Sequence, residues 1–562
     1  MKRNSLILAI VAVIVVIVIV AAAYVLLAAP RTKLQMELWY NSDGHYGDTE
    51  PQLATVLKNS LEKSSKVSVT LHSDPWAVYR QNWVNERMPL FLLGWYPDYF
   101  DTDDYISPFL SVSGAASLGS FYNNSQVDAW VTQEQSTTDP VARQALMEQI
   151  QDKLAEDVPY VPLFSGNAQV AYLDNITNVF LHPVTFKWFI IDKPGATELK
   201  GATTDNIISL DPASAYDFFS IEVINQVFDT LLVYDVMNAT LMPGLATEVP
   251  TVANGGISGN GQTYTYHLRT GVTFHDGTAF NSSVVKRAID RAIRLDIPGS
   301  AAFLLYDVGG LGRSAANGNN TAPGVITTPD ANTIVFNLNK PLGFFNDLMA
   351  FSAAAPVPWT YSQTGEQPST VPNVIGTGPY RLTTHQADTL VVLDSYAGYY
   401  GTTLYAPAVA SIPKVPRVSI DLVGSATNLK QSIETKQVDV AFRTLTPTDL
   451  TDLQNRASTL GLKVDIGASP QIRYLVFNVN LVPDVRVRRA IAYLVDRPLI
   501  DSQVFQGLVE PLYSMVPPNM PFAKAVFQTA YGNGNVAAAD NILAGLGYAI
   551  QFRQHEIARE IG

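Results

Sequence analysis

The pattern of apolar and polar residues in the first part of the chain switches repeatedly between two periods. Residues 34–40 (LQMELWY) and 67–72 (VSVTLH) suit a period of two, which predicts two strands. Residues 50–64 have helical spacing between them, and residues 76–83 predict a second helix. Strands that alternate with helices in this way indicate an α/β fold.

A longer helix and two extended segments follow. Asp139 and Pro140 suit the N-cap and the first turn of a helix, because the acid accepts backbone N–H bonds and proline has no N–H to lose. The apolar positions of this helix fall on one face, as expected for core packing: Leu146, Ile150 and Leu154. Residues 158–164 (VPYVPLF) then predict a strand that prolines interrupt, and residues 179–191 predict extended chain.

The first residues of the chain form the longest apolar run. Lys2 and Arg3 precede residues 5–29, which carry no charge. As a helix of about 1.5 Å per residue, this run is long enough to cross the hydrocarbon core of a bilayer. The basic residues before it place the N-terminus in the cytoplasm and the rest of the chain outside. We therefore expect an uncleaved anchor, while cleavage after the run and pilin-like processing before it both stay open.

Potential N-glycosylation sequons all follow this run, which fits an exported glycoprotein. They begin at Asn123, Asn175, Asn238, Asn281 and Asn319.

Composition and length limit the function classes. The chain has 562 residues, too many for one small core, so two or more lobes are expected. Hydrophobic residues make up 47% and charged residues 15%, which indicates a globular protein. The net charge of −13 disfavours a nucleic-acid partner. The absence of cysteine excludes disulfides, thiolate metal sites, thiol nucleophiles and a lipid-modified cysteine.

Residues 94–105 (GWYPDYFDTDDY) are the strongest candidate for a ligand site. The apolar run 89–93 before them predicts a buried strand that ends at Gly94. The glycine would let a ligand approach the backbone. Trp95 offers a flat apolar face and Asp98 a fixed negative charge, a combination that suits ligand capture.

Two further interpretations of these residues stay open. The simpler one is a solvated acidic surface loop, and the second is a Ca²⁺ site, because hard cations prefer several oxygen ligands. The spacing does not match an EF-hand. The acids concerned are Asp98, Asp101, Asp103 and Asp104.

Catalytic and metal motifs are weak elsewhere in the sequence. His275 and Asp276 lie side by side, but no nucleophile motif accompanies them, and the spacing suits a strand, a turn and a helix N-cap near Asn281 or Ser282. The seven histidines include no pair at i and i+4, so a histidine metal site is not expected.

The segment GWYPDY resembles the pocket segment of the solute-binding proteins that serve peptide-type (oligopeptide/dipeptide/nickel) ABC importers. In that family the acid at the position of Asp98 holds the free amino group of a peptide. Trp76, in DPWAVY, lies where oligopeptide binders carry a pocket tryptophan. Leu92 stands where some of them have an arginine. The resemblance therefore implies Trp76, Gly94, Trp95 and Asp98 as ligand-binding residues and leaves the partner of a ligand carboxylate unassigned.

Further segments resemble the family in its own order along the second part of the chain. They are residues 203–217, 266–285, 376–382, 436–442 and 477–497. Residues 34–194, by contrast, resemble the part that closes a family member, and here they come first. We infer a circular permutation with new ends near Leu34 and Tyr548. Exposed loops tolerate the placing of new chain ends. A mis-joined gene fragment would also give this order.

The resemblance implies a bilobal α/β periplasmic-binding-protein-like fold of type II, permuted, with a small extra subdomain and one preceding transmembrane helix. We expect residues 1–33 to form a membrane anchor and residues 549–562 a tail. The second lobe comprises residues 34–160 and 468–548. The first lobe comprises residues 161–225 and 344–467, with its small subdomain at residues 226–343.

The function so implied is capture of a small ligand, a di- or oligopeptide, outside the membrane and its delivery to an ABC permease. No cofactor, metal, catalysis or nucleic-acid partner is expected. An oligosaccharide ligand stays open, because aromatic faces and acids suit sugars equally well and no basic residue is found for a peptide carboxylate. Two further function classes also stay open: a surface-structural or sensory protein, and a secreted hydrolase.

Overall fold

The computed structural model describes residues 33–548 except 44, 47–48, 238–239 and 259. The predicted membrane anchor at residues 5–29, the sequon at Asn238 and the tail 549–562 lie outside the described residues. Within the described part of the chain, no helix has the length and apolar character needed to cross a bilayer.

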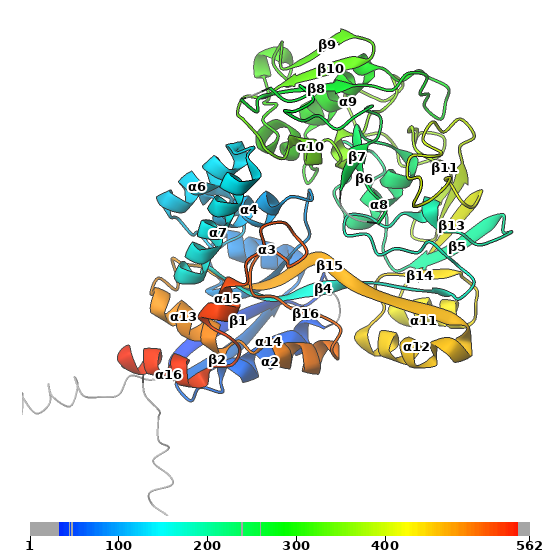
Figure 1. Ribbon diagram of the computed structural model, residues 1–562. Coiled ribbons are helices and arrows are strands. Elements are labelled where there is room, and N and C mark those ends of the chain that lie inside the picture. Colours follow the sequence, from blue (N-terminus) through cyan, green and yellow to red (C-terminus); the bar gives the residue numbers. More distant parts are fainter. Residues whose placement is uncertain (1–32, 44, 47–48, 238–239, 259, 549–562) are drawn as a thin grey trace, which may run out of the picture.

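One long sheet organises the molecule. Its eleven strands follow the order β11-β12-β13-β5-β14-β4-β15-β3-β1-β2, with β16 beside β4. The two longest strands, β4 (Tyr160–Leu173) and β15 (Leu462–Phe477), are antiparallel and run through its centre. At one end β15 pairs with β3, and at the other end β4 pairs with β14. These two strands therefore connect two halves of the molecule (Figure 1).

The first of these, which we call the β1 half, has a core drawn from two separate stretches of sequence, residues 34–164 and 472–543. Its strands β1, β2 and β3 are parallel, and the helices α2 and α3 connect them as βαβ units. The bounds of these strands and of β16 are Leu34–Asn41, Val67–Asp74, Leu90–Trp95 and Glu510–Pro511. Early and late segments thus build one body.

Helices surround this half of the sheet (Figure 1). They are α2 (Glu50–Leu61), α3 (Trp76–Val84), α4 (Ser107–Leu110), α5 (Val112–Ser117), α6 (Ser125–Ser136), α7 (Pro140–Asp157), α13 (Val485–Leu494), α14 (Arg497–Ile500), α15 (Val526–Ala530) and α16 (Val536–Gly545). The N-cap prediction for α7 is confirmed, since the Asp139 side chain accepts a bond from the Ala142 N–H.

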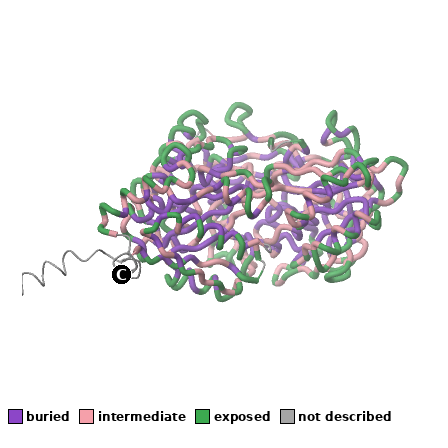
Figure 2. Tube along the Cα trace, turned by 90° about the horizontal axis from the view of Figure 1, so that it is seen from below, coloured by how far each residue is buried: buried purple, intermediate pink, exposed green. Residues whose placement is uncertain are grey.

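The other half, which we call the β5 half, has separate cores drawn mainly from residues 170–462. The end of the long sheet in this half consists of β5 (Glu198–Thr203), β11 (Tyr380–Gln386), β12 (Leu390–Ser395), β13 (Arg417–Leu422) and β14 (Val440–Phe442). The helices packed near it are α8 (Phe218–Val227), α11 (Ala426–Glu434) and α12 (Pro447–Leu460). Buried stretches fill the interior of both halves, while exposed loops form the rim (Figure 2).

A small separate sheet with its own core caps the β5 half at the top of Figure 1. It contains β8 (Thr263–His267), β10 (Thr333–Asn337) and β9 (Ile326–Asp330), and a two-stranded ribbon of β6 (Leu232–Tyr234) and β7 (Leu241–Pro243) lies below it. Its helices are α9 (Ser282–Leu295) and α10 (Phe345–Leu348). Asn281 caps α9, as predicted, and His275 and Asp276 lie in the turn before it.

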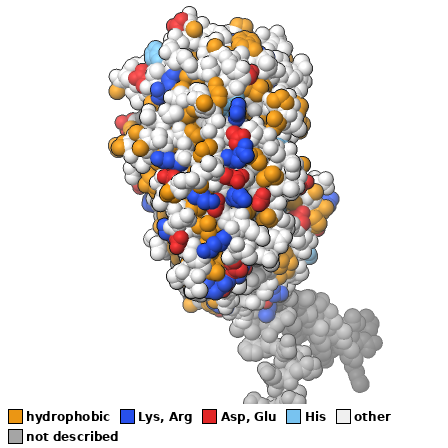
Figure 3. Space-filling view, turned by 90° about the vertical axis from the view of Figure 1, so that its right-hand side faces the viewer, with side chains coloured by type: hydrophobic (Ala, Val, Ile, Leu, Met, Phe, Trp, Pro, Cys, Tyr) orange, Lys and Arg blue, Asp and Glu red, His pale blue; other side chains and the backbone are white. Residues whose placement is uncertain are grey.

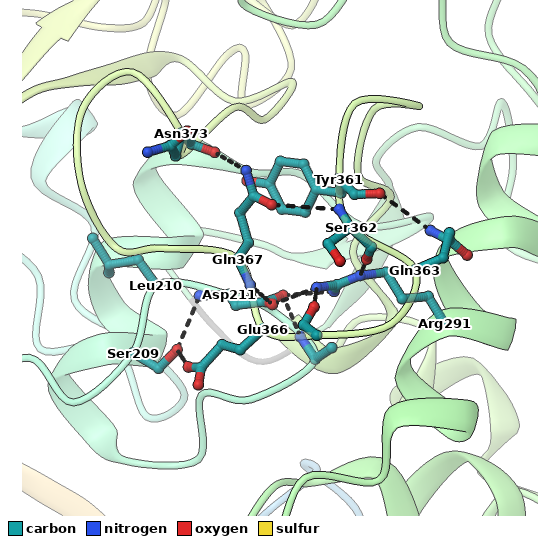
Figure 4. Close-up of polar contacts among 12 residues, drawn as sticks. Ser209, Leu210, Asp211, Arg291, Tyr361, Ser362, Gln363, Glu366, Gln367 and Asn373 are labelled. Carbon is teal, nitrogen blue, oxygen red and sulfur yellow. Dashed lines mark hydrogen bonds and ion pairs between the residues drawn. The ribbon is translucent and has the colours of Figure 1, made fainter.

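A buried ion pair ties this cap to the rest of the β5 half (Figure 4). Arg291 of α9 holds both carboxylate oxygens of Asp211, at 2.8 and 2.6 Å. The same carboxylate accepts a bond from the Gln367 N–H. Because both partners are almost fully buried, the pair fixes the loop around Gln367 against α9.

Charges of both signs are interspersed on the side that carries α11 and α12 (Figure 3). Surface ion pairs of this region include Lys430 with Asp452 and Arg417 with Asp394, both at 2.7 Å. Among the described residues on this face, the basic side chains form no extended patch of the kind that nucleic acids require.

Three sequence predictions need correction. The strand β3 continues through Gly94 and Trp95, because both pair with β15. The strand β4 is not interrupted at Pro162, since the register shift beside it accommodates a residue that cannot donate to the ladder. Residues 179–191 form no regular strand, and Trp188–Ile190 is a single 3₁₀ turn, η2.

Candidate functional site

The loop after β3 is held in shape by its own acids, so its interpretation as a solvated acidic surface loop is wrong. Asp103 and Asp104 are buried. Asp104 accepts bonds from the Trp95 indole N–H at 3.2 Å and from the Asp98 backbone N–H at 2.7 Å. The Tyr99 hydroxyl donates to Asp103 at 2.5 Å, and Arg143 pairs with Asp101 at 2.7 Å. Protein donors thus occupy both oxygens of Asp101 and Asp103 and one oxygen of Asp104, which leaves few oxygens for a Ca²⁺ ion.

This loop crosses from the β1 half into the β5 half. The Tyr96 hydroxyl donates to the Pro183 carbonyl at 3.1 Å. The Tyr99 ring stacks on Phe344 with centroids 4.8 Å apart. The Phe100 N–H donates to the Tyr234 hydroxyl at 3.4 Å. These contacts place the loop as one wall of a partly open cavity whose other walls belong to the β5 half.

That cavity has a volume of about 260 Å³. This volume lies just below the range of roughly 300–1,000 Å³ that is usual for ligand pockets in proteins. Eleven of the 25 described residues that line the cavity are aromatic: Trp95, Tyr96, Tyr99, Phe100, Phe189, Tyr216, Phe218, Phe228, Tyr234, Phe351 and Tyr405. The charged residues in the wall are Asp98, Lys187, Asp217, Asp229 and Asp347.

Asp98 and Trp95, two of the residues singled out in the sequence, line the cavity. The Asp98 carboxylate accepts a bond from the Tyr216 hydroxyl at 2.5 Å, which joins the two halves. Burial raises the pKa of Asp98 well above its ordinary value, and the bond from Tyr216 offsets part of this effect. A cationic partner would restore the ionised form of this carboxylate.

Gly94 and Trp76 are not among the residues that line this cavity. A Cβ on Gly94 would lie 2.7 Å from the Arg473 guanidinium and 2.8 Å from the Tyr46 ring, so close side-chain packing explains this glycine. The Trp76 ring stacks on His45 with centroids 3.7 Å apart, within the β1 half. The structure brings Trp95 and Asp98 together but leaves Trp76 outside the cavity.

Sequence reasoning missed Lys187, Asp229 and Tyr216. Lys187 is the only Lys, Arg or His among the described residues that line the cavity. Its one sequence signal is a charge inside the apolar run VTFKWFII. Burial lowers the pKa of Lys187 to about 8 and raises that of Asp229 to about 7. These residues are distant in sequence from residues 94–105, so only the fold brings them to one cavity.

Comparison with known proteins identifies the family. Residues 240–557, more than half of the chain, match the family model described as bacterial extracellular solute-binding proteins, family 5 (middle). The chain belongs to this family. Family 5 membership also accounts for the α/β binding-protein-like fold described above.

Curated relatives of this family 5 protein include the glutathione-binding protein GsiB of Escherichia coli K12. It is 27% identical over 337 residues, which are 59% of this chain and 58% of GsiB. GsiB of Shigella flexneri matches to the same extent. The chain thus spans somewhat less than 60% of the length of the curated relatives that it matches.

Two solved structures can be set beside it. The superposition with the Escherichia coli murein tripeptide binding protein MppA covers 63% of this chain and 67% of the MppA chain, with 21% sequence identity and a TM-score of 0.46. The superposition with the binding protein AgaA from A. tumefaciens R10, in complex with agropinic acid, covers 62% of this chain and 64% of the AgaA chain. The sequence identity is 19% and the TM-score is 0.45.

Proposed function

We propose that this protein is the extracellular solute-binding component of a peptide-type ABC importer. It captures a short peptide in the cavity and delivers it to a permease in the membrane. The observation that carries this proposal is an aromatic cavity between the two halves with a carboxylate, Asp98, from one half and an ammonium, Lys187, from the other. No bond of the ligand is made or broken in this role, so the protein is not an enzyme and needs no cofactor.

In this proposal Trp95 packs against the apolar part of the ligand, and Asp98 binds its α-amine. The charge-assisted bond strengthens when water leaves the site. Gly94 and Trp76 support the site from outside. The cavity volume of about 260 Å³ favours a di- or tripeptide over a long peptide. Glutathione, the ligand in the name of the GsiB relatives, is a tripeptide and belongs among the candidates.

We further propose that the two halves act as the lobes of a clamp. The second lobe comprises residues 34–160 and 468–548, and the first comprises 161–225 and 344–467 with a small subdomain at 226–343. Closure about β4 and β15 would bury the ligand between them. The sets of core residues support this division except at its first boundary, because Val161, Leu163 and Phe164 belong to the core of the β1 half.

We also propose that the order of these segments results from a circular permutation. Leu34 and Tyr548 line the same surface depression of the β1 half, which supports new ends at these positions. A variant that joins Tyr548 directly to Leu34 and opens the chain near Gly195 should then fold and unfold at nearly the same temperature. Failure of the rejoined variant to fold would contradict the permutation.

We propose that residues 5–29 anchor the protein in the cytoplasmic membrane with the cavity outside. Fractionation of cells that express the full chain, beside a variant without residues 1–33, tests this. The full chain should sediment with membranes and be accessible to protease from outside, whereas the shortened chain should do neither.

Calorimetry with the purified protein tests the proposed function. Glutathione and a defined pool of tripeptides are compared with a defined set of oligosaccharides. The aromatic wall keeps a sugar as the second candidate, since aromatic faces also stack on sugar rings. Peptide binding supports the proposal, sugar binding alone replaces it, and binding of neither favours a structural or sensory role.

A further inference from the structure

Lys187 is a buried cation that no described residue neutralises directly. Its side chain is 7% exposed, and it lies just before the 3₁₀ turn at Trp188–Ile190. The ammonium lies 5.7 Å from the ring centres of Phe189 and of Tyr405. It forms no hydrogen bond or ion pair with another residue in the described part of the chain. A buried ammonium without a partner is costly, so a site that keeps one is suited to an anion.

Thr185 supplies a second polar group at the same place. Its side chain is 5% exposed and lines the cavity, and its hydroxyl oxygen has no hydrogen-bond partner among the described residues. Thr185 and Lys187 are two positions apart in the sequence, and both line the cavity. Buried polar groups in folded proteins are normally satisfied, so this hydroxyl is suited to donate a hydrogen bond to an anionic ligand.

The surrounding carboxylates do not remove this requirement. Asp229 and Asp235 are the acids whose charge acts on Lys187, and neither forms an ion pair with it. Burial raises the pKa of Asp229 to about 7. In its protonated form Asp229 carries no charge and does not repel an anion bound at Lys187. One ammonium and one hydroxyl match the charge and the acceptors of a single carboxylate better than those of a phosphate dianion.

We propose that Lys187 and Thr185 together bind a carboxylate of the ligand and, with Asp98, select zwitterionic short peptides over neutral sugars. This inference rests on the proposed function and adds to it the residues that recognise the anionic end. The sequence around Leu92 could not supply such a residue, because Lys187 comes from a different segment and the other half of the molecule.

The test compares two defined pools of the same tripeptides, one with free C-termini and one with C-terminal amides. Native mass spectrometry and calorimetry measure their binding to the full-length protein. The wild-type protein should bind the free-acid pool about 10- to 100-fold more tightly, the effect expected for hydrogen bonds to a charged group. The variant K187M should bind free acids only as tightly as amides, while K187R should retain part of the preference.

The variant T185V should lose a smaller part of this preference. K463M changes an exposed lysine on β15 and serves as the matched control; it should bind both pools as the wild type does. Thermal unfolding checks that each variant is folded. If neither pool binds, the proposed function fails together with this inference. If both pools bind equally well, or if K187M keeps the preference, the peptide-binding function stands and the carboxylate site is overturned.

Discussion

Asp98 is the residue whose contribution can be separated most cleanly from that of its neighbours. The variant D98N keeps an oxygen that can accept the Tyr216 hydroxyl but loses the negative charge. Binding of a peptide with a free amine should therefore weaken by about 1.5–3 kcal/mol, the range for hydrogen bonds to charged groups. Calorimetry with a free and an N-acetylated tripeptide pool measures this.

The acetylated pool should bind D98N and the wild type alike, because it has no ammonium to lose. D152N, at an exposed position of α7, should leave both affinities unchanged. Equal affinity of D98N and the wild type for the free peptides would remove the amine assignment.

The two tryptophans that the sequence singles out should have different roles. Trp95 lines the cavity, so W95L should weaken ligand binding about tenfold or more through lost aromatic contact. Trp76 packs on His45 and Trp83 away from the cavity, so W76L should mainly lower the free energy of unfolding, by about 1–3 kcal/mol. Parallel calorimetry and urea unfolding distinguish these outcomes. A large loss of affinity in W76L would show that Trp76 belongs to the ligand site.

At the scale of single residues, the sequence could reveal Asp98 and Trp95, because a short contiguous motif carries both. It could not reveal Tyr216, Lys187 or Thr185. They come from segments that the fold alone brings opposite the loop after β3, and a lysine within an apolar run does not by itself indicate a ligand site. The acids after Asp98 gave a wrong prediction for a related reason. Their number indicates solvent exposure, whereas in the structure Arg143, the Tyr99 hydroxyl and a backbone N–H group bind their carboxylates.

Helix ends and strand ends differ in how well the sequence specifies them. The N-caps at Asp139 and Asn281 were predictable, because a cap is a local bond between neighbours in sequence. The end of β3 was not, since its last two residues are strand only through pairing with β15, which lies far away in the sequence. A short stretch of sequence can therefore predict a hydrogen bond between neighbouring residues, but it cannot predict which distant strand pairs with it.

The cap of α7 allows a direct measurement at the scale of one element. The Asp139 side chain accepts the Ala142 N–H at 2.8 Å, so D139A should leave that donor without its protein partner. The expected loss in free energy of unfolding is about 1 kcal/mol. Urea unfolding followed by circular dichroism measures it. Q144A, at an exposed position of the same helix, is the control and should change stability by less than about 0.5 kcal/mol.

At the scale of the whole molecule, the two-part core was predictable from the order of family-like segments, but the continuous sheet was not. Only the coordinates show that β4 and β15 pair along most of their length and that both halves share this sheet. In the proposed clamp, closure would have to bend or twist these two strands. The loop that carries Asp98 follows β3, the neighbour of β15, and would then move with that closure.

Buried acids in the β5 half predict how the stability of the whole protein depends on pH. Burial raises the pKa of Glu222 to about 8 and that of Asp229 to about 7, from ordinary values of 4.5 and 3.8. Between the ordinary and the raised values, the folded state holds protons that the unfolded state has released. Stability is therefore greatest at low pH within this window and falls as pH rises through it, by up to about 1.4 kcal/mol per pH unit for each group.

The variant E222Q isolates one of these groups. Glutamine keeps an oxygen for the Trp188 indole N–H, which donates to Glu222 at 2.7 Å, but it does not titrate. Urea unfolding between pH 5 and pH 8 should give a shallower decline for E222Q than for the wild type. E148Q, at a surface position of α7, should follow the wild-type curve. If E222Q and the wild type decline in parallel, Glu222 is already ionised in the folded protein, since only a group that holds its proton there can contribute to the slope.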